Sequence, residues 1–407
     1  MQASERILKI LLVLFLISVF LTTVAGSIVQ AFEKGPWTFG DWLINYRGGF
    51  ARRGLLGEII YWFSKSSFLS PAFFVIACHT FFYGIFFYYS YLLLKKQQSM
   101  VPFVFLIFSP FLFLFQIVGP GGGYRKEIIF FALFSFLAYS LKCKPEKFKT
   151  RFLVSLCFYP ILGLCHELLS LLMFYLLALL FVEKRSFNFN PVEKLLILLS
   201  TFLNFAVFVF SILFPGNQEA QQKIISSLRG LSYIPGEPGA IDFLAVPFSN
   251  HWKAFDLGFY ESKYYLYGIN LILICLAFFP LKERILALLK NKKALNLVLG
   301  NFFIFIPVFI FSVDWGRWFY VHAVTLFILL TVVKPVKDEI KFVGLGIKKI
   351  LAGLFVLLIY SQAWRLEHYA PSQIFVSRLN IARFKDPFQK IFKKSKKDFI
   401  DLFVKKW

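Results

Sequence analysis

Apolar runs of close to twenty residues constrain this sequence more than any other feature. A helix needs about 20 consecutive apolar residues to cross the hydrocarbon core of a bilayer, and such runs recur along the whole chain. Of the 407 residues, 58% are hydrophobic, 56 are Phe and only 16% are charged, whereas a soluble domain is nearer a quarter charged. The sequence therefore predicts an all-α integral membrane protein that crosses the bilayer many times.

The apolar runs predict about eleven spans, within a range of about ten to twelve. Residues 1–363 then form one multispanning membrane domain. The first run is too long for a signal peptide and lacks a clear cleavage site, so we expect it to remain as a helix. The expected spans are 7–31, 70–94, 100–118, 127–142, 152–165, 168–182, 194–214, 264–280, 294–312, 317–333 and 345–363.

The segment 152–182 is either one very long helix or a hairpin of two short spans. A single helix would put nearly all later basic loops outside, against the positive-inside rule. We therefore prefer the hairpin, which turns at His166 and Glu167. Its arms are short, so we expect the turn to lie below the membrane surface.

The basic residues orient the chain with its N-terminus in the cytoplasm, because the inner segments then hold more Lys and Arg than the outer loops. The outer loops become 32–69, 119–126, 215–263 and 313–317. With eleven spans the tail 364–407 lies outside although it is very basic, and the alternative is that one of the expected spans is wrong. The tail's Phe and Ile residues among lysines favour an amphipathic surface helix, and a solvated basic tail is the alternative.

The formal net charge of +23 points to anionic lipid headgroups and the lipid bilayer as partners, not to nucleic acid. The five cysteines are scattered and have the spacing of neither a metal site nor a disulfide framework. We expect no metal and no cofactor.

The stretch 40–62, GDWLINYRGGFARRGLLGEIIYW, holds two acids and three arginines directly after the first span. Its second half has apolar residues at helical spacing, which predicts a juxtamembrane helix lying in the interface. Two further stretches combine charges with a turn at the outer ends of spans. In GGGYRKE, free backbone N–H groups near Arg125 and Lys126 would make a phosphate cradle. His166 and Glu167 are ionisable residues at membrane depth, which favours a functional site.

The loop 215–263 and the motif DWGRW complete the set of polar segments on the outer side. Asp314 and Arg317 are three residues apart and can pair on one helix face.

Arginine binds phosphate through a planar two-pronged fork, and a carboxylate or His can activate a hydroxyl. The candidate catalytic residues are Asp41, His166, Glu167 and Asp314. The candidate phosphate-binding residues are Arg47, Arg52, Arg53, Arg125, Lys126 and Arg317. The candidate sugar- or acceptor-binding residues are Arg229, His251 and Trp252.

The motifs GGFARRGLLGE, GGGYRKE, CHE and DWGRW, with the Phe-rich spans and one larger outer loop, resemble the bacterial Wzy-type O-antigen and capsule polysaccharide polymerases. The first outer loop is also similar to that of GT-C glycosyltransferases, in which an acid after the first span precedes a juxtamembrane helix and acts as the base. Asp41 has that position, although Trp42 replaces the second acid of the usual pair.

These resemblances imply a multipass protein of the bacterial inner membrane with its active face in the periplasm. As a polymerase it would act on undecaprenyl-pyrophosphate-linked repeat units, with His166 or Glu167 as the base, alongside other polysaccharide-assembly proteins. As a GT-C enzyme it would use a polyprenyl-phosphate-linked sugar, with Asp41 as the base. A third possibility is a transporter or flippase of lipid-linked glycans, but charges along a path through the spans would then be expected.

Overall fold

The computed structural model describes residues 2–183, 187–246, 263–337, 347–369, 371, 373–376 and 382–405. Within these ranges the protein is helical and has no β-strand, only isolated backbone bridges. The all-α prediction is therefore confirmed. Six described helices are long and apolar enough to cross a membrane: α1 (Gln2–Phe32), α4 (Pro71–Lys95), α9 (Pro145–Cys165), α12 (Pro191–Leu213), α17 (Lys292–Phe311) and α18 (Trp315–Val332).

The expected count of about eleven spans is not confirmed, because the other predicted spans fold as shorter helices. The shorter helices are α2 (Gly40–Leu43), α3 (Gly54–Ser66), α5 (Val104–Ile107), α6 (Phe115–Val118), α7 (Pro120–Gly123), α8 (Glu127–Cys143), α10 (Glu167–Leu171), α11 (Met173–Ala178), α13 (Gln218–Arg229), α15 (Tyr267–Phe278), α16 (Lys282–Lys290), α19 (Ile347–Ala363), α20 (Ala382–Phe392) and α21 (Lys396–Phe403).

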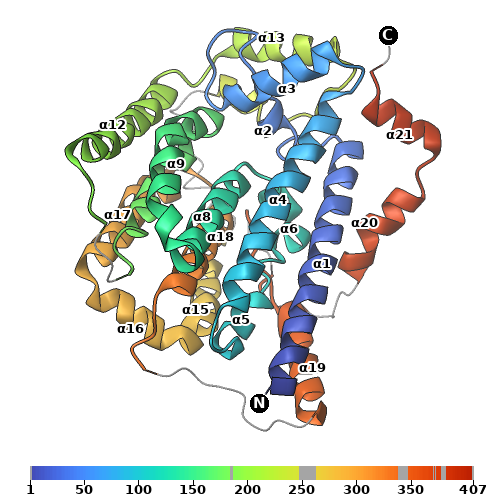
Figure 1. Cartoon of the computed structure of the whole chain (residues 1–407). Helices are drawn as coiled ribbons and strands as arrows, with labels where there is room; N and C mark the ends of the chain where they lie inside the picture. The colour runs from blue at the N-terminus through green and yellow to red at the C-terminus, as the bar shows by residue number, and fades with distance from the viewer. Residues whose placement is uncertain are drawn as a thin grey trace.

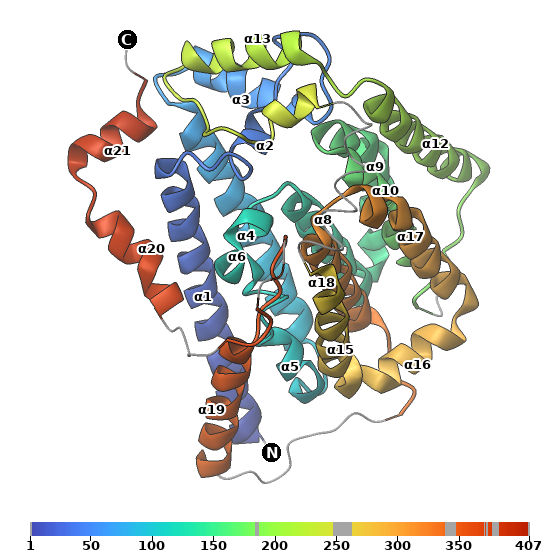
Figure 2. The same ribbon diagram turned by 180° about the vertical axis from the view of Figure 1, so that it is seen from behind.

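The long helices pack into one bundle. Helix α4 packs against α1 and α8, and α9 packs against α8 and α12. Helix α18 contacts both α4 and α8 and is the most deeply buried of the six long helices. Helices α2, α3 and α13 lie across one end of the bundle, which we call the loop end, and the N-terminus lies at the opposite end (Figures 1 and 2).

Helix α12 indicates what surrounds this bundle. Its buried residues are the polar Ser200, Asn204 and Ser211, while Leu198 and Phe202 point outward and are 66% and 65% exposed. A surface helix in water has the reverse arrangement, with the apolar face buried. In hydrocarbon, exposed Leu and Phe carry no penalty and polar groups pack inward against other helices. The exterior of α12 is therefore that of a membrane protein.

The predicted span 100–118 is broken into η1 (Val101–Phe103), α5 and α6. Pro102 and Pro110 lie within it, and proline removes a backbone donor and clashes with the preceding helical turn. The side chains of residues 111–115 are fully buried. This segment is therefore part of the protein core, not a straight span that faces lipid.

The chain turns at His166, where α9 ends and α10 folds back against it. The second arm of this hairpin is itself broken between α10 and α11. Neighbouring side chains bind the carbonyl groups near the break: Asn204 Nδ2 donates to Ser170 O at 2.8 Å, and Tyr159 Oη donates to Leu169 O at 2.5 Å. Irregular backbone at membrane depth is tolerated only where protein groups satisfy it in this way.

The C-terminal residues 382–405 dock toward the loop end. Helix α20 packs beside α1, and α21 contacts α4 (Figures 1 and 2). The Ser70 backbone N–H donates to Phe403 O at 2.9 Å, and the Lys405 N–H donates to Phe68 O at 2.9 Å. The end of the tail is thus held against the end of the first loop.

Candidate active site

Charged side chains from four separate segments meet at the loop end. They come from α2–α3, from the residues at the start of α8, from the turn between α9 and α10, and from the start of α18. Most of them are buried. We call these nine residues the charge cluster: Asp41, Arg53, Arg125, Lys126, Glu127, His166, Glu167, Asp314 and Arg317.

Arg53 joins two carboxylates that are far apart in the sequence. Its Nε donates to Glu167 Oε2 at 2.8 Å, and its Nη2 donates to Glu167 Oε1 at 2.5 Å. Its Nη1 donates to Asp41 Oδ1 at 3.2 Å. Two-pronged pairing of a guanidinium with a carboxylate is among the strongest side-chain contacts. Arg53 therefore fixes the α2–α3 segment against the turn that carries Glu167.

The local fold of α2–α3 brings Asp41 beside Arg53. A Cβ atom at Gly57 would lie 1.9 Å from the Ile44 carbonyl oxygen, so glycine allows α3 to pack closely on the end of α2. Arg53 has φ +67°, a left-handed conformation that is uncommon for a residue with a side chain. Such strained residues concentrate at functional sites.

Arg317 is the second guanidinium centre of the charge cluster. Its Nη2 donates to Glu127 Oε1 in a short contact, and its Nη1 donates to Asp314 Oδ2 at 3.1 Å. The predicted pairing of Asp314 with Arg317 is therefore present. The positive charges of Arg317 and Arg125 outweigh the effect of burial, which alone would raise the pKa of Asp314, and they hold that pKa below its ordinary value.

His166 caps α10. Its Nδ1 accepts a hydrogen bond from the Leu168 backbone N–H at 3.2 Å. Its Nε2 lies 3.1 Å from Arg317 Nη2 and 3.8 Å from Glu127 Oε1. A neutral ring has one lone pair, on Nδ1 or on Nε2 according to the tautomer, and the groups that face the two nitrogens, the Leu168 N–H and the Arg317 guanidinium, are both donors. In either tautomer the lone pair faces a protein donor, so His166 in this arrangement has no acceptor left for a substrate proton.

Arg125 and Lys126 hold the centre of the charge cluster mainly through backbone carbonyl groups. Arg125 Nη1 donates to Trp37 O at 2.7 Å, while its Nη2 lies 3.9 Å from Asp314 Oδ2. Lys126 Nζ donates to Arg53 O at 2.8 Å. Burial, and then the charge of Arg317, lowers the pKa of Arg125 to about 10, so its guanidinium stays charged at neutral pH.

The charge cluster is close to electrically neutral, yet some of its groups lack a partner. Four cations balance four carboxylates: Arg53, Arg125, Lys126 and Arg317 against Asp41, Glu127, Glu167 and Asp314. Among the described residues, Asp41 Oδ2, Arg125 Nε and Arg317 Nε are buried without a hydrogen-bond partner. A buried polar group without a partner costs about 1–3 kcal/mol, so these atoms mark where a polar ligand would be stabilised.

Asp41 has one carboxylate oxygen that is buried without a hydrogen-bond partner. Burial alone would raise its pKa, but the positive charges of Lys126 and Arg53 outweigh burial and hold the pKa well below its ordinary value of 3.8. The side chain is therefore a carboxylate at neutral pH. One of its oxygens binds Arg53 and the other is open to a donor.

The glycine-rich loop differs from the predicted phosphate cradle. A Cβ atom at Gly121 of this loop would lie 2.6 Å from His368 Cε1. A Cβ atom at Gly316, in the first turn of α18, would lie 1.8 Å from Glu367 O. The glycines therefore make room for the backbone and side chain of 366–368, which follow α19. Burial lowers the pKa of His368, so the ring is neutral at pH 7. No local pattern in the sequence could have placed His368 here.

Glu127 was also missing from the predicted site residues. It follows Arg125 and Lys126 directly and begins α8. An acid at the start of a predicted span is expected to pair with a cation, so this signal was available in the sequence.

The structure does not bring every predicted residue into the charge cluster. Arg47 pairs with Glu58 at 3.4 Å on the exposed side of α3. Arg52 borders the charge cluster, with its guanidinium 5.7 Å from the Phe243 ring, and Arg229 is exposed at the end of α13. His251 and Trp252 lie outside the described residues.

The charge cluster reaches the surface only at its edges. The side chains of Asp314 and Arg53 are 20% and 15% exposed, while that of Asp41 is fully buried. Within the described ranges, no group of three or more His, Cys, Asp or Glu side chains is arranged to hold a metal ion.

No protein-family model, curated protein or solved structure matches this sequence.

Proposed function

We propose that this protein transfers a glycan from a polyprenyl-linked donor in bacterial surface polysaccharide assembly, by polymerising undecaprenyl-pyrophosphate-linked repeat units. The observation that carries the proposal is the buried charge cluster, built from four segments at one end of an apolar bundle. In the proposed orientation the loop end faces the periplasm, the chain lies in the inner membrane, and the shorter apolar helices complete a total of about eleven membrane-inserted segments.

Three cations would bind the leaving pyrophosphate. Arg125 has the longest ion pair of the charge cluster, 3.9 Å to Asp314, so a phosphate oxygen can replace that carboxylate as its partner. Lys126 donates to one carbonyl group and has N–H groups to spare. Arg52 lies beside the charge cluster and has no carboxylate within ion-pair distance in the described part of the chain. Preorganised cations stabilise the charge that develops on a leaving group.

Asp41 is the best-placed group to receive the acceptor's proton. The acceptor hydroxyl oxygen would attack the anomeric carbon, the bond from that carbon to the pyrophosphate oxygen would break, and the hydroxyl proton would pass to Asp41 Oδ2. The single lone pair of a neutral His166 faces the Leu168 N–H or the Arg317 guanidinium, according to the tautomer, and both oxygens of Glu167 bind Arg53. In this proposal His166 and Glu167 position Arg317 and Arg53 instead of acting as bases.

A GT-C transferase that uses a polyprenyl-phosphate-linked sugar is the second candidate. The position of Asp41 in α2, between the first long helix and the juxtamembrane helix α3, with one oxygen that has no partner, favours it. The two candidates share the membrane face, the base and the leaving-group chemistry, and they differ in the donor.

The test is the surface polysaccharide banding pattern of a strain that lacks the gene and is complemented with variants. We expect Asp41→Asn and Arg125→Lys to fail to restore the pattern, because the first removes a carboxylate and the second loses the planar fork. Lys223→Arg, a charge-preserving change at a lysine that is 55% exposed and is not a candidate site residue, should restore it. Melting temperatures of the purified variants separate lost chemistry from lost folding.

The form of the defect distinguishes the candidates. Single repeat units without a ladder support the polymerase. A complete ladder whose repeats lack one sugar supports the GT-C transferase. An unchanged pattern in the deletion strain, or full restoration by both Asp41→Asn and Arg125→Lys, overturns the proposal.

A further inference from the structure

A groove of about 390 Å³ lies between the last turn of α1 and the C-terminal residues 382–405, which we call the C-terminal arm. Its floor is apolar and includes Val29 and Phe32 of α1, and its rim carries Lys390, Lys393 and Lys394. An apolar floor below a cationic rim suits a ligand that has an anionic headgroup and an apolar body.

The two acids of the groove do not neutralise all three lysines. Glu33 pairs with Lys390 at 2.6 Å. The Asp398 carboxylate accepts hydrogen bonds from the Ser395 N–H and hydroxyl at 2.7 and 3.0 Å, which forms part of the N-terminal cap of α21. Lys393 and Lys394 have no carboxylate within ion-pair distance in the described ranges. The rim therefore offers two ammonium groups to an anion.

The groove lies where the apolar surface of α1 ends. Below it, Ile10, Leu14, Ile17 and Leu21 form a stripe along α1 in which each side chain is at least 50% exposed, as expected for a face that meets acyl chains. The lysine rim follows within a turn of the end of that helix. If the α1 stripe meets acyl chains, lysines just beyond its end lie near the lipid phosphates.

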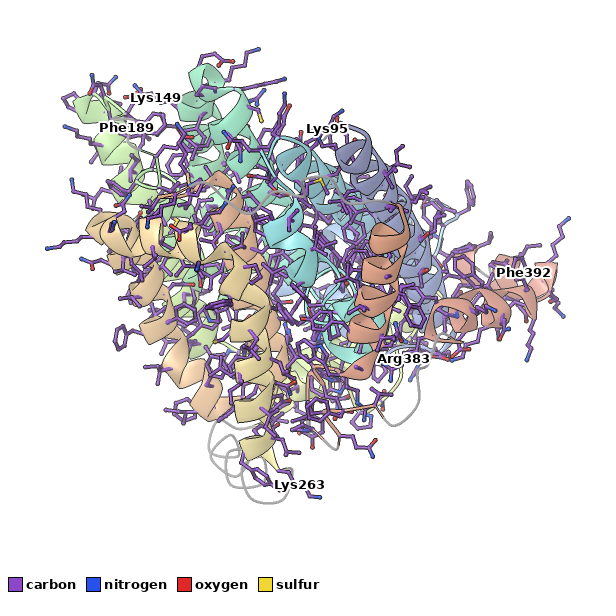
Figure 3. The ribbon with its side chains drawn as sticks, turned by 90° about the horizontal axis from the view of Figure 1, so that it is seen from below. Lys95, Lys149, Phe189, Lys263, Arg383 and Phe392 are labelled. Carbon is purple, nitrogen blue, oxygen red and sulfur yellow. The ribbon has the colours of Figure 1, made fainter. Side chains whose placement is uncertain are left out.

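The C-terminal arm also presents apolar side chains away from the bundle. Phe392 is 84% exposed and precedes the two lysines (Figure 3), and Ile400 of α21 is 50% exposed. Exposed aromatic and aliphatic residues beside lysines are typical of helices that lie in the membrane interface. A small soluble anion would make no contact with these apolar side chains, so they favour a lipid as the ligand.

We propose that this groove binds the phosphate headgroup of an anionic phospholipid in the leaflet at the loop end. Lys393 and Lys394 contact the phosphate, and the acyl chains lie over the apolar floor and the α1 stripe. This site is separate from the charge cluster and does not depend on the activity proposed for it.

The test measures lipid binding by the full-length protein in detergent, by native mass spectrometry during titration with phosphatidylglycerol or phosphatidylcholine. The variant Lys393→Gln/Lys394→Gln removes two charges from the rim. Its matched control, Lys396→Gln/Lys397→Gln, removes two charges from exposed positions on the same arm that do not line the groove. All four residues are exposed, and Lys394 also lies 4.9 Å from the Phe32 ring, so equal melting temperatures of the two variants are required to show that neither disturbs folding.

We expect wild type to prefer phosphatidylglycerol and the rim variant to lose on the order of 30-fold in affinity for it, from about 1 kcal/mol per lysine. The control should stay within about threefold of wild type, because its lysines do not contact the headgroup. Equal losses in both variants would mean that the arm attracts lipid only through its net charge, and the site would be rejected. Competition by inorganic phosphate at equal concentration would also overturn it in favour of a simple anion site.

Discussion

Replacing Arg53 by Met should destabilise the protein more than almost any other single substitution on its surface or loops. The change removes the contacts to Glu167 at 2.5 and 2.8 Å and the contact to Asp41 at 3.2 Å. Both carboxylates stay behind with side chains that are at most 6% exposed. Removing one partner of a buried ion pair costs about 3–5 kcal/mol, because the remaining charge is uncompensated.

The assay is the denaturant-unfolding free energy of the purified protein in detergent, with Lys390→Met as the matched control. Lys390 pairs with Glu33 at 2.6 Å, but the two side chains are 57% and 47% exposed, and such a pair contributes at most about 1 kcal/mol. The double variant Arg53→Met/Glu167→Leu should recover part of the loss, because it removes one of the stranded charges. If Arg53→Met costs no more than Lys390→Met, then Arg53 is not buried between two carboxylates.

Three further predictions test the elements that support the site. Gly57→Ala should lower the unfolding free energy by about 1–3 kcal/mol through overpacking, whereas Gly268→Ala, with nothing within 4 Å of its Cβ position, should leave it almost unchanged. Asn204→Leu should cost about 1–2 kcal/mol, measured the same way, because it leaves the carbonyl of Ser170 without its donor. The folded-state pKa of Asp41 lies below its ordinary value of 3.8, so its stabilising contribution is present above that value and is lost as the pH falls below it. Melting curves should therefore show this loss below about pH 4 and a weaker loss in Asp41→Asn.

Much of the architecture could be predicted from local sequence. The long helices α1, α4, α12, α17 and α18 each follow an apolar run of about the required length. Helix α9 is longer than the short arm expected at 152–165, because it begins at Pro145. The turn at His166 was predicted because a single helix over 152–182 would have put the later basic loops outside, and the two arginines at its sides, Arg53 and Arg317, were predicted to share its face. These inferences succeed because length, hydropathy and charge each act over a few residues.

The remainder depends on contacts that no local pattern contains. The run 100–118 is as apolar as a lipid-facing helix, but its side chains pack against protein, and only Pro110 in its middle indicated a break. The glycines before Arg125 were expected to receive a phosphate, whereas His368 packs against them from far along the chain. Apart from the pair of Asp314 with Arg317, which are three residues apart, the sequence did not indicate which arginine pairs with which acid, because any of the arginines could have paired with Glu127.

The order in which the chain is synthesised gives the charge cluster a consequence for biogenesis. Asp41 and Arg53 leave the ribosome with the first helices, whereas Arg317, which neutralises Glu127, follows only with α18. Until Arg317 is synthesised, Glu127 stays in water or beside lipid headgroups, since an unpaired charge is not stable in hydrocarbon. A nascent protein halted before α18 should therefore hold α8 loosely in the bilayer and be a preferred target for membrane quality-control proteases.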